Sequence, residues 1–231
     1  MNFFGDSLMS AFGLMLSLDK ELIEIVRVSL NVSLASTIIA GVAGIPAGFV
    51  ISTGDFPLKR GVITLLNTLL ALPTVVIGLL VYAMISRNGI FGVYDLLYTQ
   101  KAIIIGQIIL VMPIVTTFTI SAISRIDARY RKTAMTLGAS PFQTALVILK
   151  EARFGITAAV VAAFGRVISE IGICMMLGGN ISGYTRTMTT AMALQYDKGE
   201  FVLAIALGII LLAISLVVNI SLTYFQGKAT G

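Results

Sequence analysis

The chain has 231 residues, of which 57% are hydrophobic and only 12% are charged, and its mean hydropathy is +0.98. Soluble domains carry about 25% charged residues, so this composition argues against a soluble protein and indicates a multi-pass membrane protein. The net charge of +5 does not predict nucleic-acid binding, because the Lys and Arg residues lie between apolar runs, where they set membrane topology. With no His and one Cys, imidazole metal sites, thiolate clusters and a disulfide framework are excluded.

The first stretch, residues 1–21, is apolar but short and contains Asp6. We expect it to form a helix that lies in the membrane interface, with a sixth span as the alternative. Five later runs each supply the roughly 20 apolar residues that a spanning helix needs. They cover residues 28–51, 62–85, 102–123, 154–177 and 202–224. The sequence therefore predicts an all-α membrane protein whose residues 1–231 form one transmembrane domain.

The distribution of Lys and Arg predicts the orientation of these spans. With the N-terminus outside the cell, the inner side holds nine of the basic loop residues and the outer side five. Basic residues favour the cytoplasmic side, so we expect the N-terminus outside and the C-terminus in the cytoplasm. Two runs contain a proline near their middle, Pro73 and Pro113, and both are expected to kink their helices.

The loop of residues 125–153 is the most amphipathic part of the chain and falls on the cytoplasmic side. Asp127 is a good N-cap for a first helix, and Gly138 suits the left-handed position that ends it. Ser140 can cap a second helix, with Pro141 at its first position. The sequence therefore predicts helix, tight turn, helix.

The first helix of this loop carries Tyr130, Ala134 and Leu137 at positions i, i+4 and i+7, which share one helical face. Arg129 and Arg131 flank that face. A short exposed helix with an apolar face and a basic surround is expected to bind a partner. Contact with the anionic inner leaflet is the alternative.

The loop resembles the cytoplasmic loop of ABC importer permease subunits, which has the form E-A-A-x3-G-x9-I-x-L-P. Ala134, Gly138 and Ile148 match its second Ala, its Gly and its Ile. The chain departs from the pattern with Lys-Thr in place of Glu-Ala at 132–133 and with Lys-Glu in place of Leu-Pro at 150–151. Without that proline, we expect the second helix to continue into the fourth span.

A second resemblance covers residues 165–194, GRVISEIGICMMLGGNISGYTRTMTTAMAL. This segment is similar to one shared by molybdate, sulfate and tungstate permeases, and the wording GGNI-x-GYTR is most similar to the tungstate type. The resemblance implies an ABC importer permease fold in a prokaryotic cell (inner) membrane. It also implies a homodimer, two ABC ATPase subunits and an extracytoplasmic oxyanion-binding protein.

In such importers the first helix of the cytoplasmic loop docks in a groove of the ATPase. The resemblance therefore assigns ATPase coupling to Tyr130, Ala134, Leu137, Gly138, Ala139, Ser140 and Ile148. The chain itself has no P-loop, G-x4-G-K-[ST], so it is expected to bind no cofactor and to leave ATP and Mg to the partner subunit.

The fourth span contains Arg166 and Glu170, four residues apart on one helical face. Charges at membrane depth are costly and pair with one another, so these two either border an anion pathway or form a structural ion pair. Polar residues at the outer end of the span could donate hydrogen bonds to an oxyanion or satisfy loop backbone: Asn180, Arg186, Thr187 and Thr189. No metal site is predicted, because the methionines nearby suit adaptable packing.

Other functions remain open on the sequence alone. A stand-alone channel or secondary carrier would transport without ATP and would need no docking loop. An intramembrane enzyme is disfavoured by the lack of His and of a paired-acid or Ser–Lys arrangement. Among permeases, molybdate or sulfate is the alternative to tungstate as the transported anion.

Overall fold

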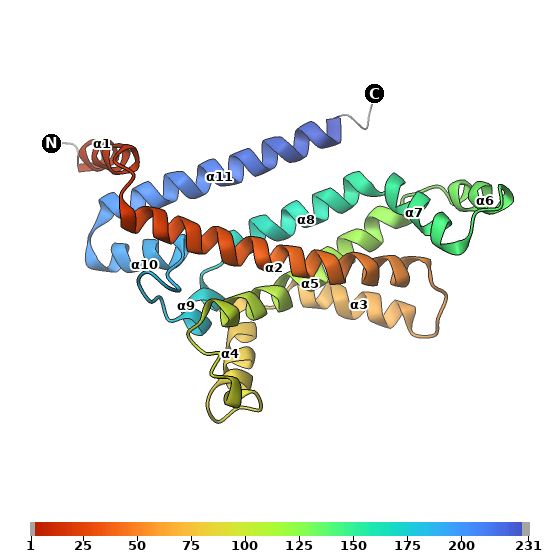
Figure 1. The fold of residues 1–231 in the computed structure, drawn as a ribbon, viewed down its shortest axis with the longest axis horizontal. Helices are drawn as coiled ribbons and strands as arrows, with labels where there is room; N and C mark the ends of the chain where they lie inside the picture. The colour runs from red at the N-terminus through yellow and green to blue at the C-terminus, as the bar shows by residue number, and fades with distance from the viewer. Residues whose placement is uncertain (1–2, 228–231) are drawn as a thin grey trace.

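The computed structural model describes residues 3–227, and every regular element in that range is helical. The elements are α1 Phe3–Leu16, α2 Lys20–Thr53, α3 Lys59–Leu70, α4 Thr74–Ile85, η1 Gly92–Tyr94, α5 Gln100–Ser124, α6 Ala128–Thr136, α7 Pro141–Glu151, α8 Arg153–Ile168, α9 Gly172–Gly178, α10 Met188–Lys198 and α11 Phe201–Gly227. Figure 1 shows α2, α5 and α8 lengthwise in the bundle. The α6–α7 loop lies at one end, and α1 and α10 lie at the other.

Three of the five predicted spans are single helices that are long and apolar enough to cross a membrane: α2, α5 and α11. The other two predicted spans are broken. Helices α3 and α4 meet at an angle of 101°, and α8 and α9 meet at 59°. The runs over 62–85 and 154–177 are therefore bent helix pairs, each of which can still form one span, and the all-helical membrane fold is confirmed.

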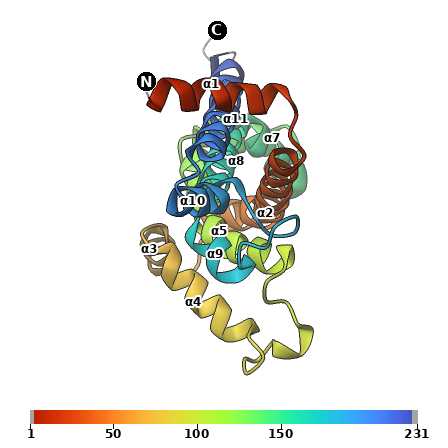
Figure 2. The same cartoon turned by 90° about the vertical axis from the view of Figure 1, so that its left-hand side faces the viewer.

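Helix α1 has 14 residues, which corresponds to about 21 Å, less than the roughly 30 Å of a hydrocarbon core. It crosses the first part of α11 in Figure 2, and Ala11 is buried in a cluster with Leu22 and Leu207. This length does not suit a sixth span. The placement of α1 in the membrane interface stays a prediction.

Helices α2 and α5 pack most closely, because α2 presents glycines to its neighbour. A Cβ on Gly48 would lie 2.8 Å from the backbone oxygen of Thr116, and one on Gly44 would lie 3.0 Å from Val115 Cγ1. Small residues allow this approach in membranes, where dispersion contacts replace the hydrophobic effect between helices. This seam holds the centre of the fold.

The two prolines behave differently. At Pro73 the chain turns and α4 begins, since proline lacks the N–H that would continue α3 and disfavours helical backbone at Leu72. Pro113 lies inside α5, which runs unbroken and is packed against α2, α8 and α9. Helix α7 ends at Glu151 and α8 starts at Arg153, so the expected continuation into the fourth span does not occur.

Candidate functional site

The loop of residues 125–153 folds as predicted from its capping residues. The Asp127 side chain accepts a hydrogen bond of 2.8 Å from the backbone N–H of Arg129 at the start of α6. Ser140 and Gln143 form a reciprocal capping box at the start of α7, which satisfies two backbone donors at once. Residues 128–151 therefore form a helical hairpin, here called the coupling hairpin.

The turn of the hairpin depends on Gly138, whose φ is +81°. The N–H of Gly138 donates to Met135 O at 3.1 Å, and the N–H of Ala139 donates to Ala134 O at 3.0 Å. These two bonds are the Schellman arrangement, which uses the last carbonyls of a helix when the next residue is left-handed. The predicted left-handed turn at Gly138 is confirmed.

The apolar surface of the hairpin differs from the predicted face. Leu137 is 82% exposed and Tyr130 is 45% exposed, but Ala134 is only 8% exposed, because α7 packs against α6. The interpretation that these three residues form one exposed face is wrong for Ala134. Met135 and Phe142, at 59% and 72% exposure, complete the exposed apolar surface, and Met135 was missed because it lies off the i, i+4, i+7 series.

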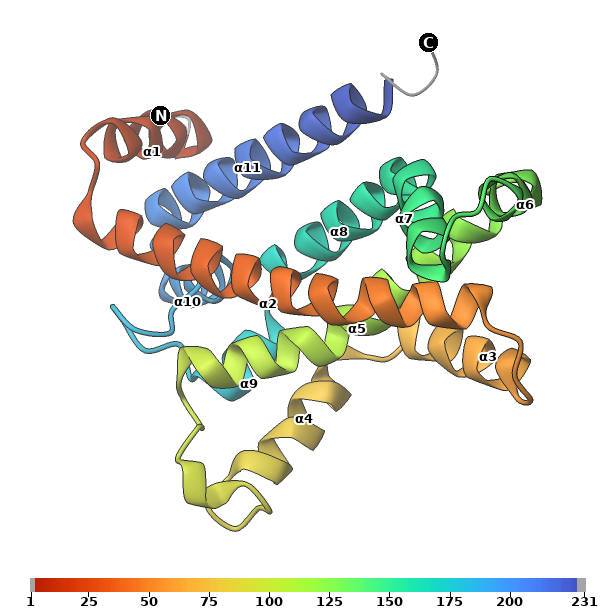
Figure 3. The same cartoon turned by 45° about the vertical axis from the view of Figure 1, so that its right-hand side comes forward.

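Ile148 packs the hairpin against the long helices. It is 6% exposed and packs in a cluster with Ile123 and Ala152, with Phe49 of α2 beside them. The matching isoleucine thus fixes the hairpin to the bundle and does not itself reach a partner. Figure 3 shows α7 beside the end of α8 and α6 farther out, at the end of the molecule.

A second group of polar residues lies at the break between α8 and α9. Arg166 Nη1 and Glu170 Oε2 are 2.8 Å apart, with the Arg166 side chain 40% exposed and that of Glu170 2% exposed. Glu170 lies beyond the end of α8, so the pair closes across the break and not along one regular helix face. Glu170 Oε1 also accepts from the backbone N–H of Ile173 at 3.3 Å.

Side chains from distant elements satisfy the backbone of this break. Gln107 of α5 donates to the Val167 carbonyl at 3.2 Å, and Thr189 of α10 donates to the Glu170 carbonyl at 2.8 Å. Irregular backbone at membrane depth is tolerated where protein supplies such partners. Side chains of α5 and α10 therefore hold two carbonyls of the α8–α9 break from within the same chain.

The α3–α4 break lies against the first break but lacks such partners. A Cβ on Gly172 would be 3.2 Å from Thr74 Oγ1 and 3.3 Å from Glu170 Oε1, so the start of α4 touches the start of α9. Within the described residues, no hydrogen bond reaches the carbonyl oxygens of Ala71 or Leu72. Ala71 is also exposed.

The predicted polar residues of the outer loop are used for structure in this conformation. Arg186 Nη1 pairs with Glu21 Oε1 at 2.9 Å, and Thr187 caps α10. Asn180 Nδ2 donates to the Thr190 carbonyl at 3.4 Å. Since Thr189 holds the Glu170 carbonyl, the structure does not direct these side chains to a common open site, and their role in an anion pathway stays a prediction.

Comparison with known proteins places this geometry in context. The family model described as "Binding-protein-dependent transport system inner membrane component" matches residues 40–230. A probable anion ABC transporter permease protein of Haloferax volcanii is 37% identical over 215 residues, covering 91% of this chain and 93% of the relative. The tungstate uptake system permease protein TupB of Peptoclostridium acidaminophilum is 36% identical over 219 residues, covering 95% and 96%.

Among solved structures, the chain is similar to one from a bacterial alginate ABC transporter in complex with an alginate pentasaccharide-bound periplasmic protein. The TM-score is 0.78 at 17% sequence identity, and the match covers 100% of this chain and 90% of that chain. At this identity the likeness concerns the fold alone.

Proposed function

The chain belongs to the family of binding-protein-dependent inner membrane transport components, and from this membership we propose that it is the permease subunit of an ATP-driven tungstate importer. ATP hydrolysis then resides on two separate ABC ATPase subunits, and an extracytoplasmic binding protein delivers the anion. The identity to a tungstate permease over nearly the whole chain supports the substrate. Molybdate or sulfate import is the second candidate.

The exposed apolar surface of the coupling hairpin is the observation that carries this proposal. Tyr130, Met135, Leu137 and Phe142 are exposed on a hairpin whose two helices are capped. Contiguous exposed apolar surface marks an interaction site. A groove of an ATPase subunit would cover it and transmit movement to the long helices through Ile148 and its cluster.

The α3–α4 break supports a homodimer with the pathway between its two copies. Backbone groups left without partners in lipid cost several kcal/mol each. The carbonyls of Ala71 and Leu72 therefore require either a second chain or water lining a pathway. Thr74, at the start of α4, touches the α8–α9 break. In this arrangement the partly exposed Arg166, which lies at that break, also borders the pathway.

The Arg166–Glu170 pair suits passage of a dianion more than its storage. Arg166 supplies positive potential, and Glu170 neutralises most of it at 2.8 Å. A pathway must bind its substrate weakly enough to release it. In this proposal specificity for tungstate resides mainly on the binding protein.

The test is reconstitution of the permease with its ATPase and its binding protein in proteoliposomes. We expect ATP hydrolysis to rise when the binding protein carries tungstate, and tungstate to enter the lumen only with ATP. A larger response to molybdate or sulfate would reassign the substrate. Anion movement without ATP or the ATPase subunit would replace the importer with a secondary carrier or a channel.

A further inference from the structure

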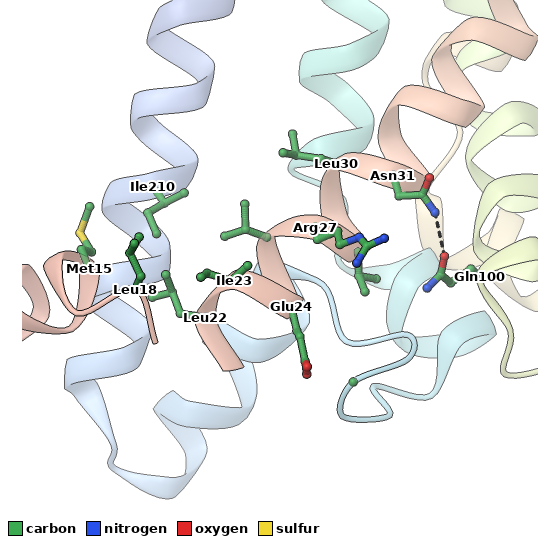
Figure 4. A pocket seen from close by; sticks show the side chains of 13 residues that line it. Met15, Leu18, Leu22, Ile23, Glu24, Arg27, Leu30, Asn31, Gln100 and Ile210 are labelled. Carbon is green, nitrogen blue, oxygen red and sulfur yellow. Dashed lines mark hydrogen bonds between the residues drawn. The ribbon is translucent and has the colours of Figure 1, made fainter. Parts of the chain in front are cut away.

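A groove of about 950 Å³ opens between α2, α11 and the segment that joins α1 to α2. Figure 4 shows its two parts. Apolar side chains line one part, among them Met15, Leu22 and Ile210. The other part is polar, with Glu24, Arg27, Asn31 and Gln100 along α2 and the start of α5. A groove divided in this way fits an amphiphile that has an apolar tail and a charged head.

The polar part contains two opposite charges that do not pair with each other. Glu24 and Arg27 are three residues apart on α2, a spacing at which side chains of opposite charge are neighbours. No ion pair joins them or involves either of them within the described residues. Figure 4 shows the Arg27 guanidinium turned toward Asn31 and the Glu24 carboxylate turned away. The wall therefore offers a cationic and an anionic group within one turn of α2.

Two side chains of the apolar part are exposed. Leu18 adopts a φ of +50°, in the left-handed region that residues with a side chain rarely adopt. Its side chain nevertheless remains 69% exposed, and the neighbouring Ile23 is 44% exposed. Both line the groove. Exposed apolar side chains in this position suit contact with the acyl chains of a lipid.

The fold places the groove near the outer surface of the bilayer. It lies at the first turns of α2, at the end of the bundle opposite the coupling hairpin. The loop at Gly183 forms part of its wall, and Arg186 and Glu21 tie that loop to α2. With the predicted orientation, this end faces the outer leaflet.

We propose that the groove binds a glycerophospholipid of the outer leaflet whose headgroup carries both a phosphate and a primary ammonium. The phosphate accepts hydrogen bonds from the Arg27 guanidinium, which offers a planar donor fork. The ammonium donates to the Glu24 carboxylate. The acyl chains lie against Leu18, Ile23 and Ile210. Bound lipid then joins α1, α2 and α11 on the side of the molecule away from α4.

The test uses the full-length permease purified from nanodiscs that contain phosphatidylethanolamine and phosphatidylcholine in equal amounts. Native mass spectrometry then counts the lipids that each variant retains. We expect preferential retention of phosphatidylethanolamine, and Arg27→Gln should reduce that retention about tenfold, the loss expected for one charge-assisted hydrogen bond. Glu24→Gln should abolish the preference for the ammonium headgroup while leaving total lipid less affected.

Lys101→Gln is the matched control, because Lys101 is an exposed cation at the same end of the bundle that does not line the groove. Equal retention in Arg27→Gln and Lys101→Gln would overturn the proposal. Short-range cross-linking between two copies through Leu18→Cys would overturn it as well, since a second chain would then occupy the groove. Because retention is measured on the permease alone, the result does not depend on which anion is transported.

Discussion

A single substitution at Gly138 separates ATPase docking by the coupling hairpin from simple contact with lipid. Gly138 has a φ of +81°, and a Cβ built there meets nothing within 4 Å. A side chain at this position therefore costs only the left-handed backbone penalty, roughly 1–2 kcal/mol, with no clash inside the chain. The membrane-embedded helices do not depend on this turn, so the variant Gly138→Asp should still insert.

The same substitution disturbs a docked surface far more than the isolated loop. Leu137, 82% exposed, precedes the turn, and its position is fixed by the hydrogen bonds that end α6. A small displacement at a close-packed interface forfeits many contacts at once, and the added carboxylate lies beside an apolar side chain. We expect Gly138→Asp permease to lose most of its ATPase subunit on purification and to stop transporting.

Gly199 provides a matched control at the opposite end of the molecule. Its φ is +76°, and nothing lies within 4 Å of its Cβ position. Gly199→Asp therefore carries the same backbone cost and the same added charge without touching the coupling hairpin. The assay measures the ATPase subunit that each tagged permease retains from membranes in which both subunits are expressed. Full retention in Gly138→Asp, or equal losses in both variants, would refute the docking interpretation.

The remaining predictions concern topology, the buried ion pair and the central seam. Cysteine probes at Ser140 and Ser182, in a background without the native cysteine, should react with membrane-impermeant maleimide from opposite sides of the membrane. Arg166→Ala should destabilise the permease by about 3 kcal/mol. This is the lower end of the cost of breaking a buried ion pair, because the Arg166 side chain is 40% exposed. Adding Glu170→Ala should recover part of that loss in a double-mutant cycle. Gly48→Val should lower the thermal midpoint of the purified protein strongly, since its Cβ would lie 2.8 Å from a backbone oxygen of α5.

Each of these predictions has an outcome that contradicts it. Labelling of the Ser140 probe from outside intact cells would reverse the proposed orientation. Additive losses from Arg166→Ala and Glu170→Ala would show that the two residues do not interact. For the seam, Gly41 is the control, because a Cβ there meets nothing within 4 Å. If Gly41→Val and Gly48→Val have similar thermal midpoints, the close approach of α5 does not depend on the missing side chain of Gly48.

The sequence was sufficient to predict the coupling hairpin, because its signals are local. Asp127, Gly138 and Ser140 act on backbone groups within a few residues of themselves. The burial of Ala134 could not be predicted from such local signals. Helical spacing gives the direction of a side chain, whereas burial depends on how α7 folds back over α6.

The broken helices could not be predicted for a related reason. Pro73 and Pro113 have similar apolar surroundings in the sequence, yet only the first ends a helix. Helix α5 is held by neighbours on several sides, which favours an unbroken helix through its proline. The carbonyls of the α8–α9 break accept hydrogen bonds from Gln107 and Thr189. Both residues lie away from the break along the chain, so these contacts depend on tertiary packing and not on local sequence.

The open α3–α4 break has a consequence for how the cell handles newly made copies of the chain. A lone copy in the bilayer presents the carbonyls of Ala71 and Leu72 without donors among the described residues, which leaves it less stable than a copy whose break is covered. Membrane proteases degrade chains according to the population of such unstable states. With the proposed homodimer covering the break, we expect the lifetime of this protein to depend on its rate of synthesis, with sparse copies removed before they meet and abundant copies retained.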